Sequence, residues 1–246
     1  AVKLVNVKYN LNIDIKENEI AVLILERPEI RYQIVKELYC QGLGLDGSFV
    51  LSENDKIQKL SQKMEFILEP FSFDENGRKV LSQLYQEMEL CCEEEFIEEK
   101  AEISAKILEL MEKISIKMPY NITSSIDVSF AELCKIYNVK LESESDSFMD
   151  KMVSYIQVMN QLCGRRLFCF LNISHYMNEE QWKYFIEYIK YQKVYALFIE
   201  FHQSDMKYVD TVCIVDADYC IIDLNYSDLQ HLPSDKFGEN LKEFEV

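Results

Sequence analysis

The sequence predicts an α/β protein with a helical domain inserted into it. Residues 164–200 have the pattern strand, helix, strand, which is a βαβ crossover and predicts two parallel neighbouring strands. A second uninterrupted apolar run, Ile20–Leu25, is typical of a strand buried on both faces. From about 73 to 144 the apolar residues take helical spacing instead. We therefore expect a discontinuous α/β head, residues 1–72 and 145–246, and an α-helical leg, residues 73–144.

The crossover begins with an apolar strand at 167–172, between a glycine-led turn and a polar segment. Asn178 is a suitable N-cap for the helix that follows, and two acids occupy its first turn. The apolar side of this helix carries residues at three- and four-residue spacing: Trp182, Phe185, Ile186 and Ile189. A second buried strand follows at 194–200, so the helix should pack on the sheet that the two strands form.

The rest of the head supplies shorter elements. Further strands are expected at 2–15 (as one or two strands), 20–25, 48–52, 66–68, 211–215 and 219–222. Pro28 suits the first turn of a helix that ends near Gly42. Another helix is expected between about 146 and 164, and Lys56–Lys63 is a short basic segment. We expect these elements to complete the sheet around the crossover or to project from it.

The leg is predicted to be one long helical stretch followed by a short helix. No proline occurs between Asp74 and about Lys117, and apolar residues there recur at the spacing of a coiled-coil seam. The acidic residues between 93 and 102 favour a solvated outer face over any chemistry. Ser129 is the expected N-cap of the short helix, and an extended piece follows at Val139–Leu141.

The composition restricts the classes of function. With 26 Lys and Arg against 43 Asp and Glu, the net charge of −17 argues against a nucleic-acid binder unless a basic patch lies on an otherwise acidic body. The eight cysteines form no CxxC pair, so we expect reduced thiols and a cytoplasmic protein. No apolar run approaches the roughly 18 residues that a membrane helix needs, and no signal peptide is visible. We therefore expect no membrane partner.

The turn after Ile20–Leu25 is the place where an α/β sheet of this kind would hold a phosphate loop. Such a loop needs glycines, a lysine and a hydroxyl. The sequence has Glu26-Arg27-Pro28-Glu29-Ile30 instead, with no glycine and with two acids that would repel a triphosphate. The glycines at 42–47 follow a helix rather than a strand, which favours a turn. We expect no nucleotide cofactor.

Two groups of carboxylates are candidates for holding a divalent ion. Asp216 and Asp218 lie between two predicted strands, where a turn is the alternative that we favour. Glu142, Glu144 and Asp146 alternate in one loop and could supply oxygen ligands to calcium, with Asp127 if the preceding connection folds back. An acidic loop that only caps a helix is the alternative. Lys135 and Lys140 present either a pair of cations on one side of the leg or ordinary surface lysines.

Five segments between about 130 and 222 have the order and spacing of a known family. They are LCKIYNVK at 133–140, ESESDSF at 142–148, RRLFCFLN at 165–172, the following helix into 194–200, and IVDADYCII at 214–222. On these segments the chain resembles the accessory protein of type II-A CRISPR systems, which acts in spacer acquisition and binds DNA ends. The N-terminal strand and helix match this family more loosely.

The resemblance implies a head that looks like a P-loop ATPase (RecA-like) sheet without its phosphate loop, and an inserted α-helical leg. It also implies a homotetrameric ring whose lysine-rich inner wall encloses double-stranded DNA threaded from an end. Calcium ions near the junction of head and leg are implied to stabilise this ring. The family's basic positions are matched here by four residues: Lys135, Lys140, Arg165 and Arg166.

We therefore expect a non-enzymatic binder of double-stranded DNA ends that acts with other CRISPR adaptation proteins and the effector nuclease. A ring is compatible with an acidic chain, because only the residues that face the hole need be basic. Two alternatives come from other classes. One is a metal-dependent nuclease that uses Asp216, Asp218 and Glu200, and the other is a protein-interacting scaffold whose acidic surface excludes DNA.

Overall fold

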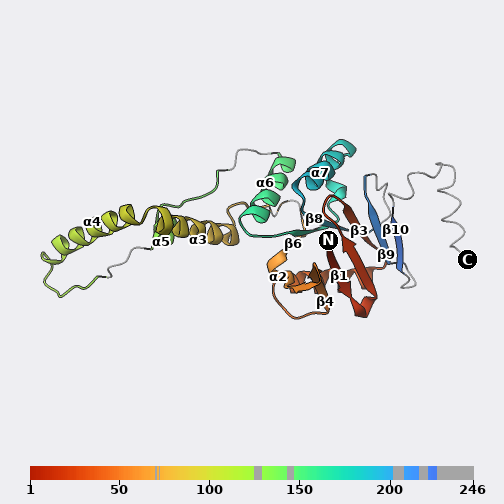
Figure 1. Cartoon of the computed structure of the whole chain (residues 1–246), viewed down its shortest axis with the longest axis horizontal. Coiled ribbons are helices and arrows are strands. Elements are labelled where there is room, and N and C mark those ends of the chain that lie inside the picture. The colour runs from red at the N-terminus through yellow and green to blue at the C-terminus, as the bar shows by residue number, and fades with distance from the viewer. Residues whose placement is uncertain are drawn as a thin grey trace, which may run out of the picture. The chain divides into compact units, whose positions relative to one another are not determined.

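The computed structural model describes residues 1–69, 71, 73–124, 129–142, 147–201, 208–215 and 221–225. The chain divides into two compact units (Figure 1). The head comprises Ala1–Phe73 and Ser145–Val246, and the leg comprises Asp74–Glu144. These borders coincide with the change in sequence pattern near 73 and 144. No helix among the described residues has the length and apolar character needed to cross a membrane.

The head is built on a six-stranded sheet with the order β10-β9-β3-β8-β7-β6. Its strands are β3 (Ile20–Leu25), β6 (Met64–Ile67), β7 (Leu167–Leu171), β8 (Tyr195–Glu200), β9 (Thr211–Val215) and β10 (Ile221–Asn225). All neighbouring strands are parallel except β9 and β10, which are antiparallel. The mixed α/β class expected from the sequence is therefore confirmed.

The crossover predicted at 164–200 is confirmed. β7 and β8 are parallel neighbours, with Leu167 opposite Tyr195. They are joined by the 3-10 turn η2 (Ser174–Tyr176) and helix α7 (Glu179–Gln192). Asn178 caps α7 by accepting a hydrogen bond from the Gln181 N–H, and the Gln181 side chain accepts one from the Asn178 N–H. This reciprocal capping fixes the point at which the helix starts.

A second sheet in the head differs from the expectation that all strands would extend or project from the first sheet. It is antiparallel, with the order β2-β1-β4-β5. Its strands are β1 (Val2–Asn6), β2 (Leu11–Ile15), β4 (Phe49–Glu53) and β5 (Lys56–Gln58). The short 3-10 turn η1 (Val7–Tyr9) connects β1 to β2. Asn54 and Asp55 connect β4 to β5, and both have positive φ, as a tight two-residue hairpin requires.

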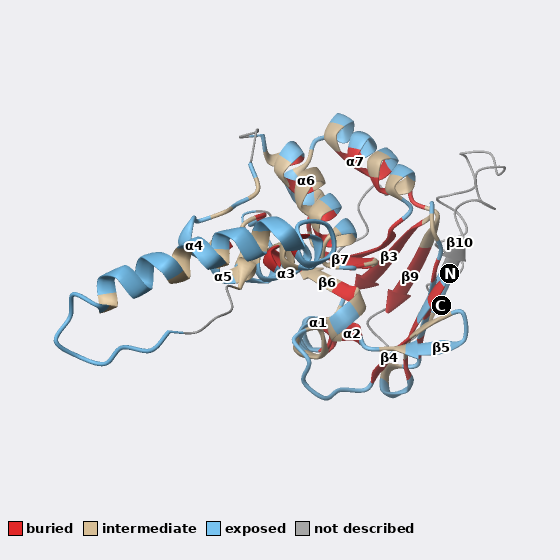
Figure 2. Ribbon diagram, turned by 60° about the vertical axis from the view of Figure 1, so that its left-hand side comes forward, coloured by how far each residue is buried: buried red, intermediate tan, exposed pale blue. Residues whose placement is uncertain are grey.

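The larger sheet is covered on both faces, and the buried residues concentrate in its strands (Figure 2). One face forms a single core with the smaller sheet and with α1 (Pro28–Gly42), where Leu23, Leu197 and Ile34 are fully buried. Toward the other side lie α6 (Phe148–Gln161) and α7. There Phe170 stacks on Phe198, and Trp182 from α7 approaches Phe198 edge-on. Burial on both faces explains why β3, β7 and β8 are almost uniformly apolar.

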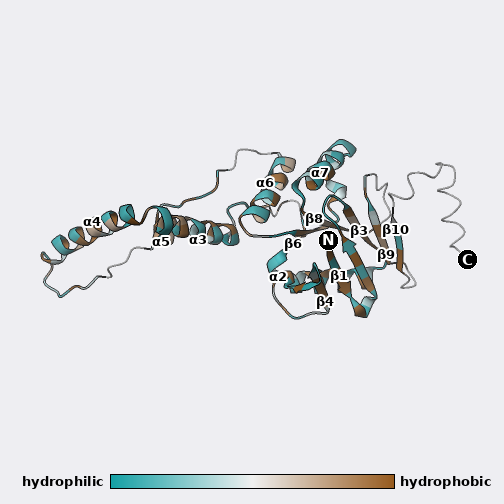
Figure 3. Cartoon of the chain, viewed as in Figure 1, coloured by the Kyte–Doolittle hydropathy of each residue, from teal (hydrophilic) through white to brown (hydrophobic). Residues whose placement is uncertain are grey.

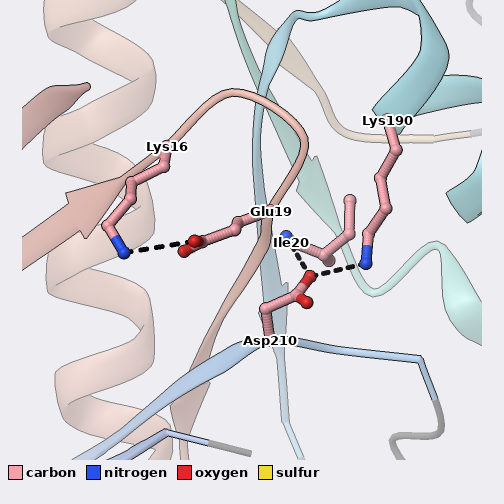
Figure 4. Close-up of polar contacts among 5 residues, drawn as sticks. All are labelled: Lys16, Glu19, Ile20, Lys190 and Asp210. Atoms are coloured by element: carbon pink, nitrogen blue, oxygen red, sulfur yellow. Dashed lines mark hydrogen bonds and ion pairs between the residues drawn. The ribbon is translucent and has the colours of Figure 1, made fainter. Parts of the chain in front are cut away.

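A polar clasp joins three elements at the amino end of β3 (Figure 4). The Asp210 carboxylate, just before β9, accepts a hydrogen bond of 2.8 Å from the Ile20 N–H. The same oxygen lies 2.8 Å from the Lys190 ammonium of α7. Nearby, Lys16 and Glu19 form an ion pair of 3.1 Å in the turn that leads into β3. Asp210 thus ties the start of β3 to α7 across a large separation in sequence.

The leg contains α3 (Arg78–Glu95), α4 (Ile97–Ser115) and α5 (Phe130–Ile136). The helical stretch expected from Asp74 to about Lys117 is present as two helices, which are separated by a break at Phe96, whose φ and ψ are −126° and 33°. Both long helices are amphipathic, as their hydropathy shows (Figure 3). No residue of α4 is buried, and an apolar cavity of about 380 Å³ lies among α3, α4 and α5.

Candidate nucleic-acid interface

The two lysines predicted to contact DNA from the leg lie in and just after α5. Ser129 caps this helix, as expected, by accepting a hydrogen bond from the Glu132 N–H. Lys135 is in the last turn, with its side chain more than half exposed and 2.6 Å from Glu132. The helix ends at Ile136, and Asn138, just beyond the C-cap Tyr137, is in the left-handed region with φ at 53°. Lys140 follows, exposed and without an ion pair to any residue that the structure describes.

The backbone that carries Lys140 is held in place from both sides. The Tyr85 hydroxyl of α3 donates a hydrogen bond of 2.8 Å to the Val139 carbonyl. The Asn76 side chain accepts a hydrogen bond from the Leu141 N–H at 2.8 Å and donates one to the Leu141 carbonyl at 3.1 Å. Residues 139–141 therefore form no strand, but they are fixed against the base of α3. Lys140 therefore lies between two residues whose backbone groups are hydrogen-bonded to the leg.

Arg165, the third predicted DNA contact, is used inside the head. Its guanidinium donates hydrogen bonds to the backbone carbonyls of Ser61 and Met64, and its Nε lies 3.7 Å from Glu65. The residue is only 8% exposed. Glu65 also accepts a hydrogen bond from the Tyr155 hydroxyl, and burial together with the Glu65 charge raises the pKa of Tyr155. Arg165 holds α2 (Leu60–Lys63) and β6 against β7 and has no free face for a phosphate.

Arg166, the fourth predicted contact, is half-exposed but already paired. Its guanidinium lies 2.6 Å from the Glu17 carboxylate and 5.5 Å from the ring centre of Tyr195. Burial, Glu17 and Glu53 raise the pKa of Tyr195 to about 12, and Arg166 opposes this shift. Arg166 thus has a carboxylate partner, as Lys135 has in Glu132, and Glu17 reduces the attraction that Arg166 could offer to a phosphate.

The predicted calcium ligands are only partly described. Glu142 is exposed at the end of the leg. Asp127, Glu144 and Asp146 lie outside the described residues, so the grouping of these four carboxylates stays a prediction. Elsewhere in the described part of the chain, no three His, Cys, Asp or Glu side chains gather as a metal site would require.

The turn after β3, where a phosphate loop would lie, is occupied by the side chain of Arg31. Its guanidinium donates hydrogen bonds to the carbonyls of Leu25, Glu26 and Phe201 at 3.1–3.4 Å. It also stacks on the Phe201 ring, 4.0 Å from the ring centre. α1 starts directly at Pro28, and no side chain caps it. An arginine that binds carbonyl oxygens thus fills the place where backbone N–H groups would face a phosphate.

Glu200 is the one described member of the proposed nuclease trio, since Asp216 and Asp218 lie outside the described residues. It ends β8 and is 1% exposed. Burial raises the pKa of its carboxyl to about 7, and the nearby Ser174 lowers the pKa only in part. With a pKa of about 7 the Glu200 carboxyl is only partly ionised at neutral pH, and its burial makes it a poor ligand for a metal ion arriving from solvent.

The sequence predicted no function for the basic segment 56–63, but in the structure this segment lies next to Arg165 and Arg166. The Arg166 N–H donates a hydrogen bond of 2.9 Å to the Lys63 carbonyl. This segment forms β5 and α2. Its lysine spacing was visible in the sequence, but its proximity to β7 required the tertiary structure.

Comparison with known proteins places this geometry in context. Residues 43–219 match a protein-family model described as CRISPR-associated protein (Cas_Csn2). The chain is 23% identical over 210 residues to CRISPR-associated protein Csn2 of Streptococcus agalactiae, which covers 83% of this chain and 90% of that protein. It is 26% identical over 163 residues to the Enterococcus faecalis protein of the same name, covering 63% and 72%.

The fold also resembles a solved structure of another class. CbiO1 from Clostridium perfringens, described as part of the ABC transporter complex cbiONQ, has a TM-score of 0.51 and 11% sequence identity. The similarity covers 93% of this chain and 89% of that chain. At this level of identity the resemblance concerns the fold alone.

Proposed function

Because the chain belongs to the Cas_Csn2 family of CRISPR-associated proteins, we propose that it binds the ends of double-stranded DNA during the acquisition of CRISPR spacers. The protein binds DNA of any base sequence and does not cleave it. The family match over residues 43–219 carries this proposal. It is supported by the turn after β3, where Arg31 binds carbonyl oxygens in the place of a phosphate loop.

A homotetrameric ring would reconcile DNA binding with the net charge of −17. Four copies of a few lysines around a hole neutralise phosphates locally, while the acidic exterior repels DNA elsewhere. Lys135 and Lys140 are the proposed contacts, since both side chains are exposed and Lys140 stands on a fixed backbone. Arg165 is left out because its guanidinium is used within the head. Other CRISPR adaptation proteins and the effector nuclease are the proposed protein partners.

Calcium is proposed to stabilise the ring through the acidic residues that flank α5. The group would comprise Asp127, Glu142, Glu144 and Asp146. Oxygen ligands of this kind suit calcium. A calorimetric titration with calcium, combined with measurement of the oligomer mass, tests this part by itself. No heat of binding and an unchanged mass would remove calcium without affecting the proposal for DNA.

The test of the DNA function compares two forms of one duplex. Linear DNA and closed circular DNA of equal length are titrated in gel shifts, with calcium and then with Mg²⁺ or Mn²⁺. If DNA can enter the ring only from an end, the protein binds the linear duplex and does not bind the closed circle. Equal binding of both forms would exclude threading. Cleavage with Mg²⁺ or Mn²⁺ would instead favour the nuclease.

A further inference from the structure

We propose that β5 and α2 form a phosphate-binding surface on the head, which we call the basic strip (residues 56–63), and that it contacts the backbone of duplex DNA. This inference rests on the proposed function, because DNA must bind at all for the strip to contribute. It replaces Arg165 and Arg166 with neighbouring lysines as the cationic surface of the head. Its residues are Lys56, Ile57, Gln58, Lys59, Leu60, Ser61, Gln62 and Lys63.

The chemistry of the strip suits phosphate. Lys56 and Lys59 are exposed and Lys63 is half-buried. None of the three forms an ion pair within the described portions of the chain, and no acid lies between 56 and 63. The other polar residues are Gln58, Ser61 and Gln62, whose side chains commonly donate to phosphate oxygens. Three unpaired cations close together in a chain of net charge −17 favour an anionic partner.

Three other lysines of the head are paired with acidic residues. Lys3 lies 3.6 Å from Asp14, Lys16 lies 3.1 Å from Glu19, and Lys183 lies 4.0 Å from Glu187. Each of these ammonium groups already has a carboxylate within reach. Lys8, Lys36 and Lys193 of the head also lack an ion pair to a described carboxylate, but they are dispersed along the chain. The strip is distinguished by having three such lysines within eight residues.

The strip is held firmly by residues that the sequence had predicted to contact DNA themselves. β5 pairs with β4, with Lys56 opposite Glu53 and Gln58 opposite Leu51. Leu60, the first residue of α2, is buried in the core of the head. The Arg165 guanidinium binds the Ser61 carbonyl, and the Arg166 N–H binds the Lys63 carbonyl. Arg165 is thus a positioning residue for the strip, and its own charge is compensated by Glu65.

Duplex DNA fits this surface better than an acidic peptide does. A lysine ammonium binds phosphate as a point charge and places little demand on orientation. Backbone binding without sequence preference requires only such contacts. Ile57 is the one large apolar side chain exposed on the strip, so the surface lacks the apolar anchors that usually hold a protein partner.

The experiment compares two triple variants with the same charge. One carries Lys56→Gln, Lys59→Gln and Lys63→Gln. The control carries Lys3→Gln, Lys16→Gln and Lys183→Gln, which removes three paired lysines. Both change the net charge from −17 to −20, so a general electrostatic effect is equal in the two proteins. Affinity for a linear duplex is measured by fluorescence anisotropy at several salt concentrations, after circular dichroism has verified folding.

We expect the strip variant to bind at least tenfold more weakly than the control at low salt. Its plot of log affinity against log salt should be shallower by about 0.9 for each phosphate that a lysine no longer neutralises, or about 2.7 for three. The control should keep the slope of the unaltered protein. A strip variant equal to the control would overturn the inference while leaving the DNA function intact.

The two proposals fail in different ways. If the unaltered protein binds no duplex, the proposed function fails and the strip has no DNA to contact. A poly-glutamate competitor provides the other check. If the strip variant loses poly-glutamate binding but keeps its affinity for DNA and its salt slope, the strip binds an acidic protein and the inference is overturned.

Discussion

Arg165 and Arg166 are adjacent in sequence but have different surroundings. Arg165 is buried and donates to two backbone carbonyls while it faces Glu65. Arg166 is half-exposed, pairs with Glu17 and lies over the Tyr195 ring. Removing a buried charge leaves its partners unsatisfied, whereas removing an exposed pair costs little. The two residues should therefore respond differently to the same substitution.

We expect Arg165→Leu to lower the free energy of unfolding by about 3 kcal/mol, because Glu65 and two carbonyls would lose their partner. Arg166→Leu should cost about 1 kcal/mol or less. Urea unfolding of both variants measures the difference. If the Arg165→Leu variant were as stable as the unaltered protein but bound DNA more weakly, Arg165 would have to be a DNA contact and not a structural residue.

Glu200 gives the head a dependence on pH. Its carboxyl has a pKa of about 7 in the folded protein and an ordinary value of 4.5. Between these values the folded state binds more protons than the unfolded state, so stability falls as the pH rises from about 5 to about 7. At 1.4 kcal/mol for each pKa unit, the full effect is about 3 kcal/mol.

Glu200→Gln should remove this dependence, because glutamine resembles the neutral carboxyl in shape and cannot ionise. We expect the variant to match the unaltered protein near pH 5 and to be more stable by about 2–3 kcal/mol at pH 8. Urea unfolding across this range provides the measurement. A stability difference that is constant with pH would show that Glu200 is not the group that titrates.

At the scale of elements, two different physical causes set the boundaries. The Asn54–Asp55 turn was not recognised as a hairpin in the sequence, although two residues that tolerate positive φ between extended segments are a hairpin signal. The break at Phe96 had no comparable signal, since the seam residues on either side keep helical spacing. The first feature was predictable from local chemistry, and the second depends on how α3, α4 and α5 pack.

The Asp210 clasp is the element-scale feature that we expect to matter most for the head. Asp210→Ala removes a hydrogen bond to the Ile20 N–H and the ion pair with Lys190, so it should cost about 2 kcal/mol. Lys190→Met keeps the bond to Ile20 and should cost about 1 kcal/mol or less. Thermal unfolding distinguishes them, and equal losses would assign the stabilisation to the ion pair.

At the scale of the whole molecule, net charge and local charge have opposite signs. The chain carries −17, yet the proposed contacts are a few exposed lysines. Long-range repulsion of DNA then coexists with short-range attraction wherever lysines gather, which is why salt dependence is the informative measurement.

Lys135→Glu combined with Lys140→Glu should weaken duplex binding at least a hundredfold at low salt and leave the oligomer mass unchanged. Both side chains are exposed and neither lies in the core, so folding should be unaffected. Lys106→Glu with Lys117→Glu, also exposed on the leg, is the matched control. Analytical ultracentrifugation and gel shifts give the two readouts. Equal weakening in the control would mean that net charge, and not these two lysines, governs binding.

The sequence by itself determined the α/β class, the βαβ crossover, the lack of a glycine-rich loop after Ile20–Leu25 and the family, because each rests on local patterns or on the order of such patterns along the chain. Only the tertiary structure decided which cations are free. Arg166 pairs with Glu17, 149 residues away, and Arg165 binds the Ser61 carbonyl, 104 residues away. Charge compensation acts through space, so residues distant in sequence set whether a basic side chain can meet a phosphate. The sequence shows the lysines of residues 56–63, but only the tertiary structure shows that no described carboxylate pairs with them.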